Sequence, residues 1–213
     1  MKQLLCFDLD GTLIQSDEVH VRAFNEAFIK NNLKPVKPII IKRLLGRKGE
    51  LIIKSIFPKL SEKIIKQIRL DHNKLIVNKY YKLAKPMKNI INNLKRLKDK
   101  FNLAVISNCT HKEIIMLLKG AKINTKLFNL IIGDDDVKHA KPAPDEILKA
   151  EKLMHVKGAC IIGDTIFDIK AGKKAKATTI AVLTGINKKE KLRKHNPDYI
   201  LKDISKIPLD IKC

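Results

Sequence analysis

The sequence lacks several features that would define its class at once. No run of apolar residues approaches the roughly 18 that a membrane-spanning helix needs. Asp8 and Asp10 interrupt the apolar N-terminal run after a few residues, so we expect no signal peptide. The four cysteines lie far apart without a C-x-x-C pair, which predicts neither a zinc knuckle nor a disulfide framework. We therefore expect a protein of a reducing, cytoplasmic compartment that has no membrane partner.

Arginine is scarce, although the chain is strongly basic. Lys and Arg number 44 against 22 Asp and Glu, for a net charge of +22, yet only six of these basic residues are arginine. Arginine makes the bidentate contacts that read phosphates and guanine edges, whereas a lysine excess spread along the chain is typical of compositional bias. Nucleic acid is therefore an unfavoured partner. Attraction of small phosphorylated anions is the simpler use of this charge.

The composition is that of a globular protein, and the first third of the chain is helical in pattern. With 213 residues, 45% of them hydrophobic and 31% charged, the chain can bury a core without disulfide or metal staples. A short apolar strand over residues 3–7 comes first. From about residue 15 to residue 83 apolar side chains recur at helical spacing, interrupted by prolines and by a turn at residues 46–49. This segment predicts a small helical insert.

From residue 84 onward, short apolar strands alternate with helices. The predicted strands cover residues 103–106, 130–132, 159–162 and 179–183, and the predicted helices cover residues 87–97, 112–119, 144–154 and 166–176. Such alternation is typical of βαβ units and a mostly parallel sheet. We expect a Rossmann-like α/β core of residues 1–14 and 84–213, with residues 15–83 inserted as a helical subdomain.

Polar residues gather where the predicted strands end, which is the edge at which open α/β sheets bind ligands. The residues at this edge are Asp8, Asp10, Ser107, Asn108, Lys141, Asp164 and Asp168. So many carboxylates would repel one another unless a divalent cation neutralised them. Because the ligands would be oxygens, without His or Cys, the expected cation is Mg²⁺.

The pair of aspartates after the first strand favours phosphoryl transfer. Asp8 and Asp10 are two residues apart, so at a strand end both side chains point to the same side. One can attack a phosphoryl group while the other moves protons, which suits a covalent acyl-phosphate route. Ser107, the Asn108 N–H group and Lys141 can hold the phosphoryl oxygens. The residues predict Mg²⁺-dependent phosphoryl transfer through an aspartyl-phosphate.

These motifs resemble those of the haloacid dehalogenase superfamily. Residues 8–12 read Asp-Leu-Asp-Gly-Thr, Ser107 closes a strand, Lys141 opens Lys-Pro-Ala-Pro-Asp, and residues 163–168 read Gly-Asp-Thr-Ile-Phe-Asp. A helical insert directly after the first motif is similar to the phosphoglycolate phosphatase and β-phosphoglucomutase branch, in which it forms a cap. The resemblance covers essentially the whole chain.

The resemblance implies a role for each motif residue. Asp8 is the expected nucleophile and Asp10 the expected general acid and base. Mg²⁺ is expected on Asp8, the Asp10 carbonyl and Asp164. Thr12 and Asp168 are expected to support the metal site from behind these ligands, Asp168 through water.

In the insert, the resemblance suggests three residues that reach the substrate or the core. The turn at residues 46–49 resembles the cap loop that contacts the non-reacting end of the substrate, which makes Arg47 and Lys48 candidate substrate contacts. The competing interpretation of these residues is a solvated turn between helices, which has the same composition. His20 lies where some relatives have a hinge histidine coupled to Asp10, and an ordinary, partly buried helix histidine is the competing interpretation.

Two further features receive structural interpretations. The acidic run of residues 134–136 is expected to cap or brace the loop that carries Lys141. Cys109 directly follows the residues expected to hold phosphate, so alkylation there would inhibit if the thiol were reactive. Inert packing is the favoured alternative.

The expected function is hydrolysis of a small phosphomonoester, a phosphorylated metabolite such as phosphoglycolate. Phosphoglycolate leads because the Gly-Asp-Thr-x-x-Asp form resembles the phosphoglycolate phosphatase side of the family. A sugar phosphomutase uses the same aspartate pair and cap, and differs in whether water or a second hydroxyl accepts the phosphoryl group. A nucleic-acid-binding protein is the remote alternative. No pattern indicates an oligomeric state.

Overall fold

The centre of the molecule is a six-stranded sheet in which every strand is parallel to its neighbours. The computed structural model describes residues 2–213. The strand order is β5-β4-β1-β6-β7-β8, so the first strand of the chain lies in the interior of the sheet. The strands are β1 (Leu4–Phe7), β4 (Asn102–Ile106), β5 (Leu130–Ile132), β6 (Ala159–Gly163), β7 (Thr178–Val182) and β8 (Tyr199–Leu201).

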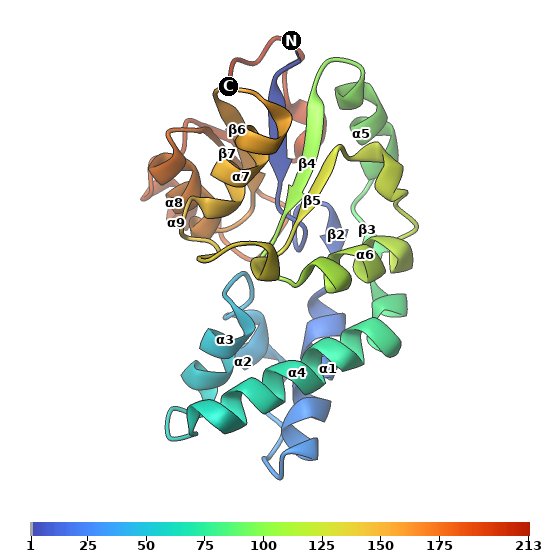
Figure 1. Ribbon diagram of the computed structural model, residues 1–213, viewed down its shortest axis with the longest axis vertical. Coiled ribbons are helices and arrows are strands. Elements are labelled where there is room, and N and C mark those ends of the chain that lie inside the picture. Colours follow the sequence, from blue (N-terminus) through green and yellow to red (C-terminus); the bar gives the residue numbers. More distant parts are fainter. Residues whose placement is uncertain (1) are drawn as a thin grey trace.

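Alternating side chains divide the core of the sheet into two faces. Leu5 and Phe7 belong to one buried cluster, and Leu4 and Cys6 belong to the other. Helices α5 and α6 cover the first face and α7 and α8 the second, with α9 beside α8 (Figure 1). These helices are α5 (Ile90–Lys98), α6 (His111–Gly120), α7 (Asp145–Met154), α8 (Ile166–Ala175) and α9 (Lys189–Arg193). Both faces are therefore covered, as a parallel sheet requires.

The helical insert leaves and rejoins the core through a small antiparallel ribbon of β2 (Ile14–Gln15) and β3 (Lys85–Pro86). Its elements lie beyond the carboxyl end of the sheet, below it in Figure 1. They are α1 (Asp17–Lys30), α2 (Pro38–Lys42), α3 (Gly49–Ile56), α4 (Glu62–Asn78) and the 3₁₀ helix η1 (Tyr80–Leu83). The predicted fold class, an α/β core with an inserted helical cap, is confirmed.

Two local features differ from the elements that the sequence predicts. The helix expected from residue 87 begins at Ile90, because Asn89 adopts a left-handed φ of 57° that a helix cannot contain. Strand β8 and helix α9 were not expected. Strand β8 has only three residues at the sheet edge, and Tyr199 is exposed, so its apolar pattern is too short to recognise.

The expectation that the cysteines form no disulfide is wrong for one pair. Cys160 in β6 and Cys213 are bonded, with their Cα atoms 4.9 Å apart and the two residues 53 positions apart in sequence. The C-terminal segment returns along the sheet, where the Lys212 carbonyl accepts a hydrogen bond from Thr178 Oγ1 at 3.3 Å. Spacing along the chain cannot reveal such a pair.

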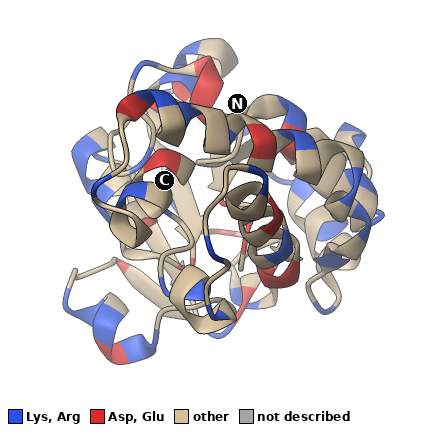
Figure 2. Ribbon diagram, turned by 90° about the horizontal axis from the view of Figure 1, so that it is seen from below, with Lys and Arg blue, Asp and Glu red and all other residues tan. Residues whose placement is uncertain are grey.

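Basic residues are spread over the molecule. Figure 2 shows Lys and Arg on many elements of the core and of the insert, interspersed with Asp and Glu. This distribution agrees with compositional bias better than with a single binding stripe for nucleic acid. Among residues 2–213, no helix is long and apolar enough to cross a membrane.

Gly120, at the end of α6, packs against the main chain of η1. A Cβ atom at this position would lie 1.8 Å from the Tyr81 carbonyl oxygen. We predict that Gly120→Ala lowers the free energy of unfolding by about 1–3 kcal/mol, although alanine is the better helix former, because α6 or η1 must shift. Urea denaturation checks this, with Lys119→Ala as the exposed control. Unchanged or increased stability would contradict the close packing.

Candidate active site

Strand β1 carries the first candidate residues to the point where the strand order reverses. The chain passes from β1 to β4 on one side and later to β6 on the other, and ligands of α/β sheets bind at such a point. Asp8 directly follows β1, and its N–H donates to the Ile162 carbonyl at 2.8 Å. Gly11 turns the chain with a φ of +80°, and a Cβ atom there would lie 2.8 Å from the Asp164 carboxylate. The motif glycine therefore lets the first loop approach Asp164.

Lys141 places a buried ammonium between two carboxylates. Its Nζ lies 2.6 Å from Asp8 Oδ1, 2.8 Å from Asp168 Oδ1 and 3.2 Å from the Ile106 carbonyl oxygen. Burial alone would lower the pKa of Lys141, but the charges of Asp168 and Asp8 outweigh it and raise the pKa well above its usual value. The ammonium is therefore charged, and its three donors are all used.

Asp8, Asp164 and Asp168 form a buried group of carboxylates. Each offers one oxygen, and these oxygens lie within 4.8 Å of one another. Burial raises the pKa of Asp164 to about 7, with the charge of Asp168 acting in the same direction. Burial also raises the pKa of Asp8, and Lys141 opposes this. Three carboxylates against one ammonium leave an excess of buried negative charge, and such a set of oxygen donors fits Mg²⁺.

Hydrogen bonds from neighbouring groups orient two of these carboxylates. Asp164 accepts hydrogen bonds from Thr12 Oγ1 at 3.4 Å and from the Ile186 N–H at 3.0 Å. Asp168 Oδ2 accepts from the N–H and the hydroxyl of Thr165, at 3.1 and 2.5 Å. Asp168 thus contacts the buried ammonium directly and lies in the same group of carboxylates as Asp8 and Asp164.

Ser107 and Asn108 follow β4 and lie buried beside the carboxylates. Ser107 Oγ accepts a hydrogen bond from the Cys109 N–H at 3.1 Å. The Asn108 amide donates to the Gly46 carbonyl at 2.7 Å and to the Lys141 carbonyl at 3.1 Å. Asn108 therefore connects the core, the cap turn and the lysine loop.

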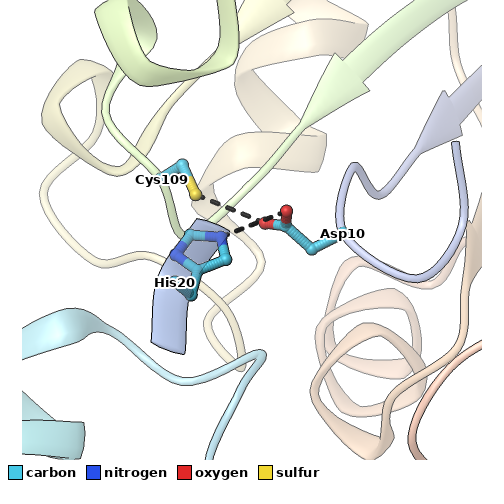
Figure 3. A group of neighbouring side chains, drawn as sticks. All are labelled: Asp10, His20 and Cys109. Carbon is cyan, nitrogen blue, oxygen red and sulfur yellow. Dashed lines mark hydrogen bonds and ion pairs between the residues drawn. The ribbon is translucent and has the colours of Figure 1, made fainter. Parts of the chain in front are cut away.

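Asp10 faces the insert and has three polar neighbours, of which His20 and Cys109 are drawn in Figure 3. It accepts a short hydrogen bond from Ser16 Oγ, and its Oδ1 lies 3.2 Å from His20 Nε2. Its Oδ2 lies 3.3 Å from Cys109 Sγ. Burial would lower the pKa of His20, but the charge and hydrogen bond of Asp10 outweigh it and raise that pKa. His20 therefore contacts Asp10 directly, and its coupling of cap closure to Asp10 stays a prediction.

A buried polar cluster that the sequence analysis missed joins the insert to the core. Arg69 in α4 contacts Glu113 of α6 at 3.3 Å and Asp134 at 3.5 Å, nitrogen to oxygen. His72, one turn further along α4, has Nε2 3.4 Å from His20 Nδ1. Burial and the positive charge of Arg69 lower the pKa of His72 well below its usual value. His72 is therefore a neutral member of this cluster, and it contacts His20 on the side away from Asp10.

The helical spacing of apolar residues in α4 indicates this cluster, because Arg69 and His72 lie on the buried face of the helix. The buried positions of α4 are Ile65, Ile68, Arg69, His72, Leu75 and Ile76. A charged residue on the apolar face of a helix needs a buried partner, so its position marks an interaction. The partner Asp134 also lies 3.8 Å from Lys48, so it faces the cap and does not brace the loop of Lys141 as expected.

A small cavity of about 30 Å³ separates the two candidate aspartates from the insert. Its lining includes Asp8 and Asp10 from the core and Arg47 and Arg69 from the insert. The Arg47 guanidinium donates to Ser55 Oγ at 3.4 Å. Residues of the core and of the insert thus face each other across this cavity. Of the two cap residues expected to reach substrate, Arg47 lines this cavity, whereas the contact of Lys48 is with Asp134.

Known proteins resemble the chain along nearly its whole length. A model of the haloacid dehalogenase-like hydrolase family matches residues 5–182. Pyrophosphatase PpaX of Listeria monocytogenes serotype 4b is 28% identical over 204 residues, which cover 94% of this chain and 92% of the relative. A structure described as a haloacid dehalogenase-like hydrolase of Bacteroides fragilis has a TM-score of 0.88 at 21% identity, covering 96% of this chain and 99% of that one. The structure of a predicted phosphoglycolate phosphatase of Haemophilus somnus 129pt has a TM-score of 0.81 at 22% identity, covering 96% of this chain and 95% of that one.

Glu146 is fully buried in the first turn of α7, near the ammonium of Lys141. Burial raises its pKa from 4.5 to about 7, with Lys141 opposing the shift. The folded protein thus binds this proton more tightly than the unfolded chain, so ionisation lowers stability as pH rises from about 4.5 to about 7.

We therefore predict that Glu146→Gln raises the free energy of unfolding at pH 8, by an amount on the order of 2–3 kcal/mol, and changes it little at pH 5. Chemical denaturation at both pH values measures this difference. Glu190→Gln, at an exposed position, is the control. An effect of equal size at pH 5 and pH 8 would show that the ionisation of Glu146 is not its cause.

Proposed function

The chain belongs to the haloacid dehalogenase-like hydrolase family, and we propose that this phosphatase hydrolyses a small phosphorylated metabolite through a phosphoryl group carried on Asp8. The contact between Asp8 and Lys141 is the observation that carries the proposal. A buried carboxylate beside a charged ammonium, at the edge of a cavity, has the surroundings that a phosphoryl-accepting nucleophile requires. Ser107 and Asn108 line the same cavity.

In the first step, Asp8 attacks the phosphorus atom of the substrate. Lys141 occupies Oδ1 of Asp8, which leaves Oδ2 as the attacking atom. An oxygen–phosphorus bond forms to Asp8 as the bond to the leaving group breaks, and the leaving oxygen takes a proton from Asp10. The Ser107 hydroxyl and the Asn108 N–H donate to the phosphoryl oxygens, and the positive charge of the Lys141 ammonium, whose three donors are already engaged, stabilises the negative charge that develops there.

In the second step, water attacks the phosphoryl group on Asp8. Asp10 takes a proton from that water, inorganic phosphate leaves, and the Asp8 carboxylate is restored. The contact with His20 supports this double role. Burial would raise the pKa of Asp10, but the charge and hydrogen bond of His20 outweigh it and lower that pKa, and His20 Nε2 lies 3.2 Å from Asp10 Oδ1, close enough for a proton to pass between them.

Mg²⁺ is the proposed cofactor, on the carboxylates of Asp8 and Asp164 and the carbonyl of Asp10. When bound, it supplies the positive charge that allows an anionic carboxylate to approach an anionic phosphoryl group. Asp164 is held for this role by the hydrogen bond from Thr12. Asp168 is engaged by the ammonium of Lys141, so its part is to fix that ammonium.

The proposed substrate class rests on the charged lining of the cavity. Asp8 and Asp10 lie on its core side, and Arg47 and Arg69 lie on its cap side. Arg47 on the cap side of the cavity can pair with a second anionic group, since its other contacts are the Ser55 hydroxyl and the ring of Phe167, 6.0 Å away. Pyrophosphate and phosphoglycolate, which appear in the names of relatives, both carry such a group.

We predict that Asp8→Asn reduces Mg²⁺-dependent phosphate release to background, because an amide is not a nucleophile toward phosphorus. Release is measured with pyrophosphate, phosphoglycolate, sugar phosphates and nucleotides, and circular dichroism confirms that the variant is folded. Activity retained in Asp8→Asn would refute the covalent route. Isomerisation of a hexose phosphate without phosphate release would favour a phosphomutase instead.

We further predict that Arg47→Ala raises KM for the doubly anionic substrates by roughly 10–100-fold, the value of a charge-assisted contact. KM for p-nitrophenyl phosphate, which lacks a second anionic group, should change little. Arg43→Ala is the matched control, because Arg43 is exposed on the same cap and outside the cavity lining. Equal losses for both kinds of substrate would contradict recognition of a second charge by Arg47.

A further inference from the structure

A carboxylate, an imidazole and a thiol meet beside the cavity (Figure 3). Asp10 comes from the loop after β1, His20 from α1, and Cys109 from the segment after β4. Each residue offers one ligand atom, and these three atoms lie within 4.8 Å of one another. The three residues therefore form a second group of potential metal ligands, distinct in chemistry from the carboxylates around Lys141.

The donor types in this group favour zinc over magnesium. Mg²⁺ prefers oxygen ligands, whereas Zn²⁺ binds sulfur, nitrogen and oxygen together. Tetrahedral coordination at ordinary zinc–ligand distances places neighbouring donor atoms about 3.4–3.6 Å apart. The observed separations are 3.3 Å from Asp10 Oδ2 to Cys109 Sγ and 3.2 Å from Asp10 Oδ1 to His20 Nε2, on the two oxygens of one carboxylate. One atom from each of the three residues lies within 4.8 Å of the other two, so rotation of the carboxylate and a closer approach of the three side chains would bring them to zinc-ligand distances.

The surroundings of His20 also resemble those of a metal-binding histidine. Such a histidine is oriented through its second ring nitrogen by a neighbouring polar group. His20 Nδ1 lies 3.4 Å from His72 Nε2, and the ring of His72 stacks on Phe24 with centroids 3.8 Å apart. His20 is thereby held with Nε2 facing Asp10.

A fourth coordination position is available at this group. Asp10, His20 and Cys109 all line the cavity of about 30 Å³, which has room for one water molecule. Three protein ligands and one open position are typical of exchangeable zinc sites rather than of closed structural ones. The group around Lys141 has oxygen donors only, so it lacks the sulfur and nitrogen ligands that favour zinc over magnesium.

We propose that Asp10, His20 and Cys109 bind a zinc-type divalent cation and that its binding inhibits the phosphatase. The bound cation would displace two protons to solvent, that of the Cys109 thiol and that of His20 Nε2, and would bind one carboxylate oxygen of Asp10. A carboxylate bound to the cation no longer takes up or supplies the proton that the two steps require. The inhibition rests on the proposed role of Asp10, whereas the binding of the cation does not.

Cobalt(II) is the spectroscopic probe for this site. It is titrated into the full-length protein in the presence of saturating Mg²⁺, which fills the carboxylate group first. Wild-type protein should develop a thiolate-to-cobalt charge-transfer band in the near ultraviolet, and Zn²⁺ should bleach it. The band should be lost in Cys109→Ala and in Cys109→Ser, whose folding is checked by circular dichroism.

Two matched controls separate this site from the other cysteines. Cys6→Ala removes the second free, buried thiol, and Cys213→Ala opens the disulfide. The band should persist in both variants. A wild-type protein without the band, or a band that survives in both Cys109 variants, would overturn the proposed site.

Inhibition is measured separately from binding. Zn²⁺ should inhibit phosphate release by the wild-type protein at a concentration at least about 10-fold lower than that needed for the same fractional inhibition of Cys109→Ser. Equal concentrations for both proteins would overturn the inhibitory role. If the protein released no phosphate from any substrate, the proposed function would fail, and the cobalt spectrum would still decide whether the cation site exists.

Discussion

The active site depends on one buried ammonium, that of Lys141 between Asp8 and Asp168. This contact joins the loop after β1, the first turn of α8 and the loop before α7 in a single polar centre. Removing the lysine would leave two carboxylates buried without a counter-charge, which typically costs about 3–5 kcal/mol. Together with Asp164, this centre contains three carboxylates and one ammonium. Its excess of negative charge suits a cation that prefers oxygen ligands.

The position of the cap depends on a second set of buried charges. Arg69 reaches from α4 to Glu113 and Asp134, and the Asn108 amide holds the carbonyl of Gly46. Buried ion pairs contribute little net stability, because desolvation offsets their attraction, but they favour one orientation of the two parts. That orientation leaves a small cavity beside Asp8, in which water is scarce and electrostatic interactions are strong.

Sequence patterns predicted the polar residues at the strand ends and missed the pairs that depend on contacts across the chain. Asp8, Ser107 and Asp164 each lie just after a strand, so their convergence could be predicted from strand periodicity and the rule that parallel strands end at one edge. The pairing of Arg69 with Glu113 joins residues 44 positions apart, and no local pattern specifies it. Arg47 and Lys48 are neighbours in sequence but have different surroundings in the structure. Arg47 lines the cavity, whereas Lys48 contacts Asp134, and only tertiary packing determines this difference.

Trapping the phosphorylated enzyme decides whether Asp8 carries the phosphoryl group. The protein is mixed with Mg²⁺ and an excess of the substrate that it turns over fastest, quenched in acid within a single turnover, and digested for mass spectrometry. We expect a phosphoryl group on the peptide that contains Asp8, absent when Asp8→Asn protein is treated in the same way. Turnover without any phosphorylated peptide, or with the phosphoryl group on another residue, would contradict Asp8 as the nucleophile.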